Sequence, residues 1–150
     1  MTETYTKLYV HVVFAVYKRQ PLISNQWSNQ LFAYINGIIS NNNHKLIAIN
    51  GMPDHIHLLI SLSPDQPISD LIRDIKSNAT LWINKNQRHP TKFTWQRGYS
   101  AFAVSFSDVN RVRDYIKNQQ EHHRTKTYQE EFIQFLNENN ISIDRWCVFK

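Results

Sequence analysis

Two short stretches of this sequence carry side chains that could do chemistry together: "PDHIHLLISL" at residues 53–62 and "YIKNQQEHH" at 115–123. In an extended chain alternate side chains share a face, so His55 and His57 would stand side by side. Neutral imidazoles placed in this way can bind one divalent metal ion from the same side. Histidines on a sheet face that helices partly cover can also be ordinary hydrogen-bonded residues. The pair alone therefore leaves both interpretations open.

The second stretch supplies a tyrosine and a glutamine four residues apart. On a helix this spacing places Tyr115 and Gln119 one above the other on a single face. Tyrosine can act as a nucleophile and form a covalent intermediate, and a glutamine carbonyl oxygen is a hard ligand suited to Mg²⁺ or Mn²⁺. Taken alone, the pair is explained by a surface tyrosine packed beside a solvated glutamine.

Together, the two pairs predict one specific reaction. A metal ion held by His55, His57 and Gln119 would polarise a scissile phosphate. The oxygen of Tyr115 would then attack the phosphorus in line. The product is a phosphotyrosine link that keeps the energy of the phosphate bond, so a DNA 3′-hydroxyl could later reseal the strand without ATP. The pattern thus predicts cleavage and joining rather than simple hydrolysis.

The elements that must position these side chains follow from the periodicity of the apolar residues. Strand patterns and helical spacing alternate along the chain. The predicted strands span about 8–17, 45–50, 55–62 and 99–106, and the predicted helices about 24–38, 68–83 and 107–123. This order predicts an α+β fold: an antiparallel sheet with helices on one side, in a ferredoxin-like or RRM-like βαββαβ core, followed by the tyrosine helix and a tail.

Local signals mark the ends of several of these elements. Ser24 and Ser107 are predicted to cap the first and third helices, and "GMPD" at 51–54 predicts the turn of a β-hairpin. A further helix is predicted at 127–139. The apolar residues of the C-terminal part would either complete the chain's own core or pack on a partner. They are Phe132, Phe135, Leu136, Trp146, Val148 and Phe149.

Composition indicates one domain, predicted to span residues 1–150, because 41% of the residues are hydrophobic. The single cysteine, Cys147, cannot form an intrachain disulfide, and the apolar run at 9–17 is too short to cross a bilayer. We therefore expect a cytoplasmic protein without a membrane segment. Residues 73–126 hold eleven Lys or Arg and four acidic residues, a difference of +7 within a chain of net charge +5. Such a block suits a polyanion, although a solvated face would look the same.

These motifs carry a resemblance to a known family. The sequence resembles the small HUH transposases that move insertion sequences as single strands: the TnpA type with one catalytic tyrosine, of the insertion-sequence-two-hundred class. The likeness covers nearly the whole chain, and its most specific parts are "MPDHIHLLISL" and "YIKNQQEHH". The other matching stretches are "VHVVFAVYKR" at 10–19, "IKSNAT" at 75–80 and "WQRGYSAFAVS" at 95–105.

The resemblance implies a role for each of the four residues. His55 and His57 match the family's metal-binding His-hydrophobic-His motif. Tyr115 matches the nucleophile and Gln119 the third ligand of the ion, which is expected to be Mg²⁺ or Mn²⁺. The resemblance also implies a homodimer in which the tyrosine helix of one subunit completes the histidine pair of the other. The substrate would be single-stranded DNA folded into hairpins near the element ends.

Several cations are predicted to contact that DNA: Lys18, Arg19, Arg73, Lys76, Arg97 and Lys117. His122 and His123 follow Gln119 closely and could be mistaken for further ligands. Because they stand at a helix end beside Arg124, we expect them to face DNA or to cap the helix.

Three other functions are compatible with parts of this pattern. A nuclease retained by a host to act on repeated palindromes would need the same four residues, and only genomic surroundings would separate it from a mobile element. A replication-initiator nuclease of the wider HUH group fits less well, because the tyrosine helix and the strand before it match the transposases. A non-catalytic nucleic-acid-binding module of RRM-like topology would expose aromatic residues on its central strands, where this chain has His55 and His57.

Overall fold

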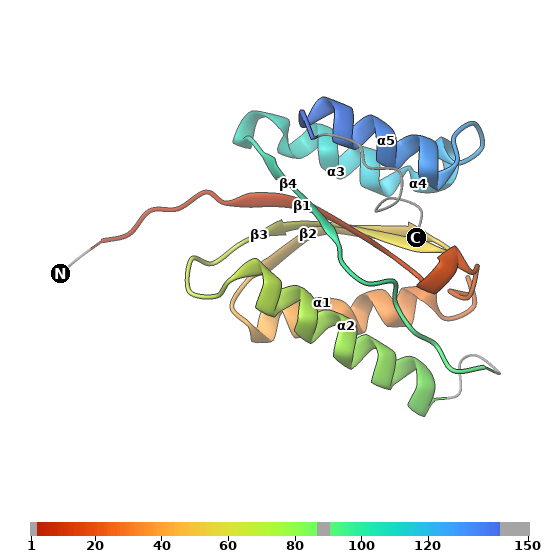
Figure 1. Cartoon of the computed structure of the whole chain (residues 1–150). Helices are drawn as coiled ribbons and strands as arrows, with labels where there is room; N and C mark the ends of the chain where they lie inside the picture. The colour runs from red at the N-terminus through yellow and green to blue at the C-terminus, as the bar shows by residue number, and fades with distance from the viewer. Residues whose placement is uncertain (1–2, 87–90, 142–150) are drawn as a thin grey trace.

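The computed structural model describes residues 3–86 and 91–141. Its centre is a four-stranded antiparallel sheet with the strand order β2-β3-β1-β4 (Figure 1). The strands are β1 (Tyr9–Ala15), β2 (Lys45–Met52), β3 (His55–Ser61) and β4 (Ser100–Val104). With one helix between β1 and β2 and another between β3 and β4, this is the βαββαβ order of a ferredoxin-like core. The predicted α+β fold is confirmed.

Two helices, α1 (Ser28–Asn41) and α2 (Ile68–Lys85), lie on one face of the sheet (Figure 1). They bury the main hydrophobic core against the apolar side of the two central strands. Its strand residues include Val12, Phe14, Ile56, Leu58 and Ile60, and its helix residues include Leu31, Ile35, Ile39, Leu71, Ile75 and Ala79. The two core helices therefore share one side, as predicted.

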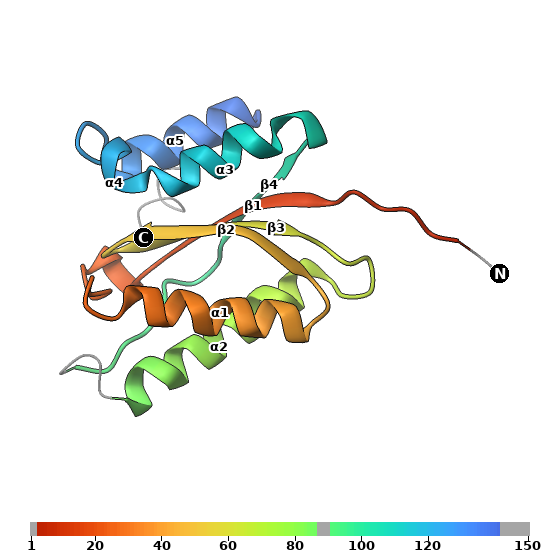
Figure 2. The same ribbon diagram turned by 180° about the vertical axis from the view of Figure 1, so that it is seen from behind.

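The opposite face of the sheet is covered by the C-terminal helices, as the view from behind also shows (Figure 2). These are α3 (Val109–Lys117), α4 (Gln119–His122) and α5 (Tyr128–Glu138). A smaller core of Ala48, Leu59, Val112 and Ile116 fixes α3 to the sheet. We call this side the histidine face, because it carries His11, His55 and His57. Alternation along β3 thus separates a core face from a polar face, as predicted.

The third predicted helix is interrupted rather than continuous to residue 123. Asn118 leaves the helical region with φ −102° and ψ 28°, between α3 and α4. The side-chain amide of Asn50 donates to the carbonyl oxygen of Lys117 at 3.0 Å. The carbonyl oxygen of Lys117 faces β2, so it accepts from Asn50 of that strand rather than from a backbone N–H in the next helical turn. The interruption therefore depends on a contact between residues far apart in the sequence.

The two predicted serine caps are also wrong. Ser24 heads the turn before α1, where its hydroxyl accepts from the backbone N–H of Gln26 at 3.1 Å, and the helix itself begins at Ser28. Ser107 lies within a short 3-10 turn, Phe106–Asp108, that precedes α3. The predicted helix at 127–139 is confirmed as α5, which Thr127 caps by accepting from the backbone N–H of Glu130.

Part of the apolar C-terminal region completes the chain's own packing. Leu136 of α5 is buried, and the ring of Phe135 packs near those of His57 and Phe102. Trp146, Val148 and Phe149 lie outside the described residues. Among the helices of the described part of the chain, none combines the length and the apolar character needed to cross a membrane.

Candidate active site

The histidine pair lies at the start of β3, beneath the C-terminal helices. The turn at Pro53 and Asp54 delivers the chain into the strand, and both His55 and His57 are completely buried. In the sheet His57 stands opposite Val13 of β1. The histidines are therefore fixed by the two central strands rather than by a loop.

Each of the two imidazoles has a hydrogen-bond partner at its Nδ1 atom. Asp54 Oδ1 lies 2.7 Å from Nδ1 of His55, and Nε2 of His11 lies 2.8 Å from Nδ1 of His57. Burial lowers the pKa of His57 to about 4 and that of His11 to about 3, so both rings are neutral at physiological pH. Partners at Nδ1 orient a histidine so that its Nε2 is presented to a ligand, which is how metal-binding histidines are usually held.

The Nε2 atoms converge on a carboxylate from α5. Glu131 is 2% exposed, and its Oε1 lies 2.9 Å from Nε2 of His57 and 3.6 Å from Nε2 of His55. Its Oε2 lies 3.4 Å from Nε2 of His123. Burial raises the pKa of Glu131, but the surrounding imidazoles outweigh it and leave the pKa well below its usual range. Conversely, burial lowers the pKa of His55, and the carboxylates of Asp54 and Glu131 outweigh this and raise it.

Tyr115 reaches the same carboxylate from α3. Its hydroxyl donates a hydrogen bond to Oε2 of Glu131, and its ring stacks on His122 with centroids 4.3 Å apart. Burial and the nearby Glu131 raise the pKa of Tyr115, so the hydroxyl is protonated at neutral pH. The structure therefore brings the predicted nucleophile to the predicted histidines within one chain.

Gln119, the predicted third ligand, is completely buried where α4 begins. Among the described residues, neither of its amide atoms has a hydrogen-bond partner of ordinary geometry, although the amide lies close enough to lower the pKa of Tyr115. Nε2 of His55 and Nε2 of His123 likewise make no hydrogen bond of ordinary geometry within the described chain, although both lie at ion-pair distance from Glu131. Buried polar atoms without partners are uncommon and call for an explanation such as a bound ion.

The donor atoms at this point fit a metal ion. One ligand atom from each of His55, His57, His123 and Glu131 lies within 4.8 Å of all the others. We call these four residues the His–Glu cluster. Imidazole nitrogens and a carboxylate are common ligands of divalent metals. The cluster can therefore hold a metal ion directly beside the hydroxyl of Tyr115.

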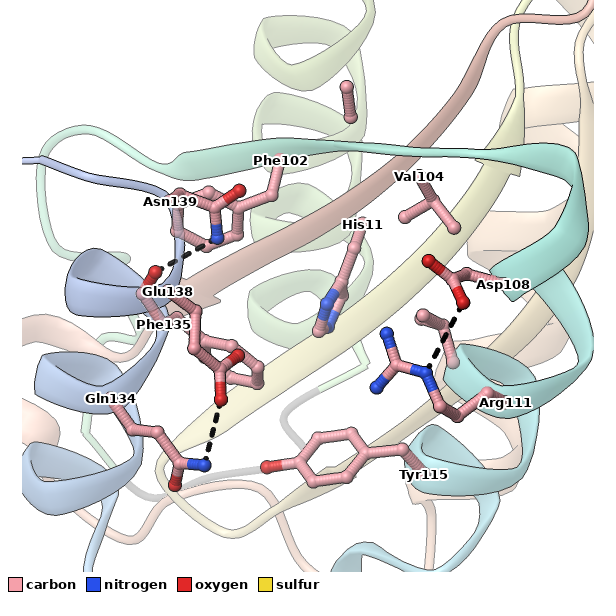
Figure 3. Close-up of a pocket in the computed structure, with 12 residues that line it drawn as sticks. His11, Phe102, Val104, Asp108, Arg111, Tyr115, Gln134, Phe135, Glu138 and Asn139 are labelled. Atoms are coloured by element: carbon pink, nitrogen blue, oxygen red, sulfur yellow. Dashed lines mark hydrogen bonds and ion pairs between the residues drawn. The ribbon is translucent and has the colours of Figure 1, made fainter.

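A cavity of about 330 Å³ adjoins the tyrosine between the sheet and helices α3 and α5. Figure 3 shows the rings of Phe102, Phe135 and Tyr115 and the side chain of Arg111 around it. His11, which supports His57 from behind, also lines it. Beside the nucleophilic candidate the cavity thus combines aromatic surfaces with Arg111, which is ion-paired with Asp108 at 3.6 Å, and with the carboxylate of Glu138.

Residues 4–119 match the family model described as "Transposase IS200 like". The chain belongs to the IS200-like transposase family. Its named relatives are transposases, enzymes that cleave DNA strands and transfer them. The predicted family and the predicted enzyme class are both confirmed.

This IS200-like transposase is similar to curated and solved proteins over most of its length. It is 25% identical to the ISDra2 transposase TnpA of Deinococcus radiodurans in an alignment of 118 residues that covers 75% of this chain and 84% of that protein. It is 22% identical to the transposase for insertion sequence element IS200 of Salmonella typhimurium in an alignment of 116 residues that covers 74% of this chain and 76% of that one.

Two solved structures share the fold. One is a candidate transposase from Deinococcus radiodurans, with a TM-score of 0.61, 24% identity and coverage of 79% of this chain and 98% of that one. The other is a REP-associated tyrosine transposase bound to a REP hairpin, with a TM-score of 0.63, 19% identity and coverage of 82% and 73%. At these identities the likeness shows the fold alone.

The cations predicted to contact DNA lie in different parts of the transposase. Lys18, Arg97 and Lys117 are exposed, and Arg19 lies with its guanidinium 6.0 Å from the ring centroid of Tyr128, which itself packs against His55. Arg19 is thus the cation of this group that the structure places near the histidines.

The two predicted cations of α2 lie in the other helical layer. Arg73 is exposed and lies 3.4 Å from Asp70 of the same helix. Lys76 donates to the carbonyl oxygen of Gln96 at 2.9 Å and to that of Gly98, and burial lowers its pKa to about 8. A phosphate would have to compete with those two carbonyls for Lys76, and its role at DNA stays a prediction.

Sequence reasoning missed His11 and Glu131, and it considered His123 but did not expect it beside the histidine pair. A signal existed for each of them. His11 is a polar residue inside an apolar strand, and Glu131 interrupts the apolar stripe of α5 where the helical period predicts a hydrophobic residue. His123 ends α4 as expected, but its side chain is only 7% exposed and faces Glu131 rather than solvent.

Proposed function

We propose that this transposase cleaves and rejoins single-stranded DNA at hairpin-bearing element ends, through a 5′-phosphotyrosine at Tyr115. The observation that supports this proposal is the hydrogen bond from the Tyr115 hydroxyl to Glu131, which lies among His55, His57 and His123. The arrangement provides a nucleophile, a carboxylate that accepts its hydrogen bond and a place for a metal ion at one point. The proposed ion is Mg²⁺ or Mn²⁺.

The protein's own groups would supply the nucleophile and orient it. Because the pKa of Tyr115 is raised, its hydroxyl must lose its proton as its oxygen attacks the phosphorus; the hydrogen bond to Glu131 would orient the hydroxyl, and the proton would pass to solvent. The new bond joins phosphorus to the tyrosine oxygen, and the bond to the 3′-oxygen breaks, which takes a proton from solvent. A later attack by a DNA 3′-hydroxyl reverses these steps: the hydroxyl loses its proton to solvent, and the departing oxygen of Tyr115 takes a proton from solvent.

A metal ion held at His55, His57 and Gln119 would supply positive charge to the phosphate oxygens. The buried amide of Gln119, which has no hydrogen-bond partner among residues 3–86 and 91–141, supports its inclusion. The cavity beside Tyr115 would receive the nucleotide next to the scissile phosphate, since Phe102 and Phe135 offer aromatic surfaces and Arg111 a cation.

The homodimer stays a proposal of its own. In one chain, α3 packs on β2 and β3, so the tyrosine and the histidines already meet without a partner. In a dimer that exchanges helices, the same contacts would join two subunits. A mixture of Tyr115→Phe and His57→Ala subunits distinguishes the two cases: strand cleavage is restored if helices are exchanged and stays absent if each chain uses its own tyrosine.

A host-retained nuclease acting on repeated palindromes is the alternative, because it would use the same side chains. The solved neighbour bound to a REP hairpin shares only the fold and does not choose between the two. The presence or absence of matching terminal hairpins around the coding sequence would decide.

The proposed reaction is tested with a single-stranded oligonucleotide that carries a hairpin and a flanking cleavage site, in the presence of Mn²⁺. We expect a protein–DNA adduct that resists denaturation and disappears in Tyr115→Phe. Tyr128→Phe is the matched control, because the ring of Tyr128 lies only 4.6 Å from that of His55. An adduct that survives in Tyr115→Phe and disappears in Tyr128→Phe would place the nucleophile on α5 rather than on α3 and would refute the proposal.

A further inference from the structure

We propose that Glu131 is itself a ligand of the metal ion, so that α5 closes the metal centre over the histidine face. The ion would be held at the His–Glu cluster, where His123 and Glu131 would join His55, His57 and Gln119 as ligands. This inference rests on the proposed function, because it assigns further ligands to the metal ion that the reaction would use.

The first argument is the geometry of the cluster. Oε1 of Glu131 lies between the Nε2 atoms of His57 and His55, at 2.9 and 3.6 Å. The rings are held from behind by His11 and Asp54, so their Nε2 atoms are directed at this carboxylate. An ion placed among these donors would meet the carboxylate as well as both imidazoles.

The second argument is where Glu131 stands on α5. The residues around it on this face of the helix are aromatic: Tyr128, Phe132 and Phe135. The rings of Tyr128 and Phe135 pack near those of His55 and His57, so this face is turned toward the sheet. Burying a carboxylate in such a stripe costs several kcal/mol unless it is paired or coordinates a metal. Glu130, its neighbour in the same helical turn, is instead exposed, and it bonds to the cap residue Thr127.

The third argument is the link to the nucleophile. While Oε1 faces the histidine pair, Oε2 accepts the hydrogen bond of Tyr115 and lies near His123. One carboxylate would thus bind the ion with one oxygen and orient the tyrosine with the other. Three imidazoles and one carboxylate are also a ligand set typical of transition metals rather than of Mg²⁺. The proposal therefore favours Mn²⁺ among the two ions expected for the reaction.

The test measures binding of Mn²⁺ alone, in the absence of DNA, by calorimetry and by electron paramagnetic resonance of the free ion. We expect Glu131→Gln, which keeps the shape of the side chain, to weaken binding at least about 10-fold, the loss seen when even an outer partner of a ligand is removed. Glu130→Gln removes the same charge from the same helical turn and should leave the affinity unchanged. Wild-type protein should bind Mn²⁺ more tightly than Mg²⁺.

Equal or tighter Mn²⁺ binding by Glu131→Gln would overturn the inference, since Glu131 would then only fill the site when no metal is bound. If Glu131→Gln does not fold, Glu131→Asp carries the same test: weaker binding and an altered visible spectrum of bound Co²⁺ support the proposal, and unchanged binding overturns it. Failure of the proposed metal centre has a different signature, namely wild-type protein whose Mn²⁺ binding is absent or is not reduced by His57→Ala.

Discussion

Replacing Gly51 with alanine tests whether the site depends on close packing of the two hairpin strands. Gly51 of β2 pairs with Ile56 of β3, and a Cβ atom at this position would lie 2.4 Å from the carbonyl oxygen of His55 and 3.2 Å from Cα of Ile56. Carbon and oxygen atoms in close contact between strands are normally about 3.3 Å apart. The backbone that carries His55 must therefore move by about 1 Å.

This displacement predicts a loss of both stability and activity. Overpacking of this kind typically costs about 1–3 kcal/mol in the free energy of unfolding. A misplacement of about 1 Å in a catalytic arrangement can slow a reaction by about 100-fold. The carbonyl of Gly51 also accepts from Gln120 of α4 at 3.2 Å, so the shift would reach the junction between the tyrosine helix and α4. Urea unfolding measures the first effect, and the rate of adduct formation the second.

Gly37→Ala is the matched control for this substitution. Gly37 lies inside α1, and an added Cβ would meet nothing within 4 Å. Alanine should therefore stabilise the protein by about 0.5–1 kcal/mol, because glycine loses more backbone freedom in a helix. If Gly51→Ala formed adduct at the wild-type rate, the close fit between β2 and His55 would not matter for the site, and this reasoning would be refuted.

Three further predictions follow from the same structure. Ile116→Ala leaves a cavity at a fully buried position between α3 and the sheet. It should lower the free energy of unfolding by about 2–5 kcal/mol in urea titrations. A loss below about 1 kcal/mol would mean that α3 does not pack on the sheet at Ile116. Lys76→Met removes a charged donor from the carbonyls of Gln96 and Gly98 and should lower the free energy of unfolding by about 1.5–3 kcal/mol in urea titrations. An unchanged free energy of unfolding would mean that Lys76 contributes only to DNA binding. Removal of divalent metal with a chelator should abolish adduct formation and added Mn²⁺ should restore it; adduct formed at full rate in the chelator would exclude the proposed metal dependence.

The sequence predicted those parts of the molecule that depend on local patterns. Alternation in β3 correctly separated His55 and His57 from the core residues Ile56 and Leu58, because side chains on a strand alternate regardless of what covers them. Helical spacing likewise placed Tyr115 on a helix beside the sheet. Recognition of the family rested on the same two motifs and is confirmed.

Long-range contacts were beyond such patterns. Glu131 meets His57 across 74 residues of sequence, and the amide of Asn50 reaches the carbonyl of Lys117 across 67. The first contact decides the composition of the His–Glu cluster, and the second decides where α3 ends. Both depend on how the C-terminal helices dock on the sheet, which periodicity within a single element does not specify.

Mass spectrometry of the protein–DNA adduct tests the central claim most directly. After incubation with the hairpin oligonucleotide and Mn²⁺, the adduct is digested, and the peptide that carries the nucleotide is identified by fragmentation. We expect the added mass on Tyr115, joined through the 5′-phosphate, because this is the tyrosine whose hydroxyl meets the carboxylate of the cluster. Nucleotide attached to Tyr128, or attached through a 3′-phosphate, would contradict the account.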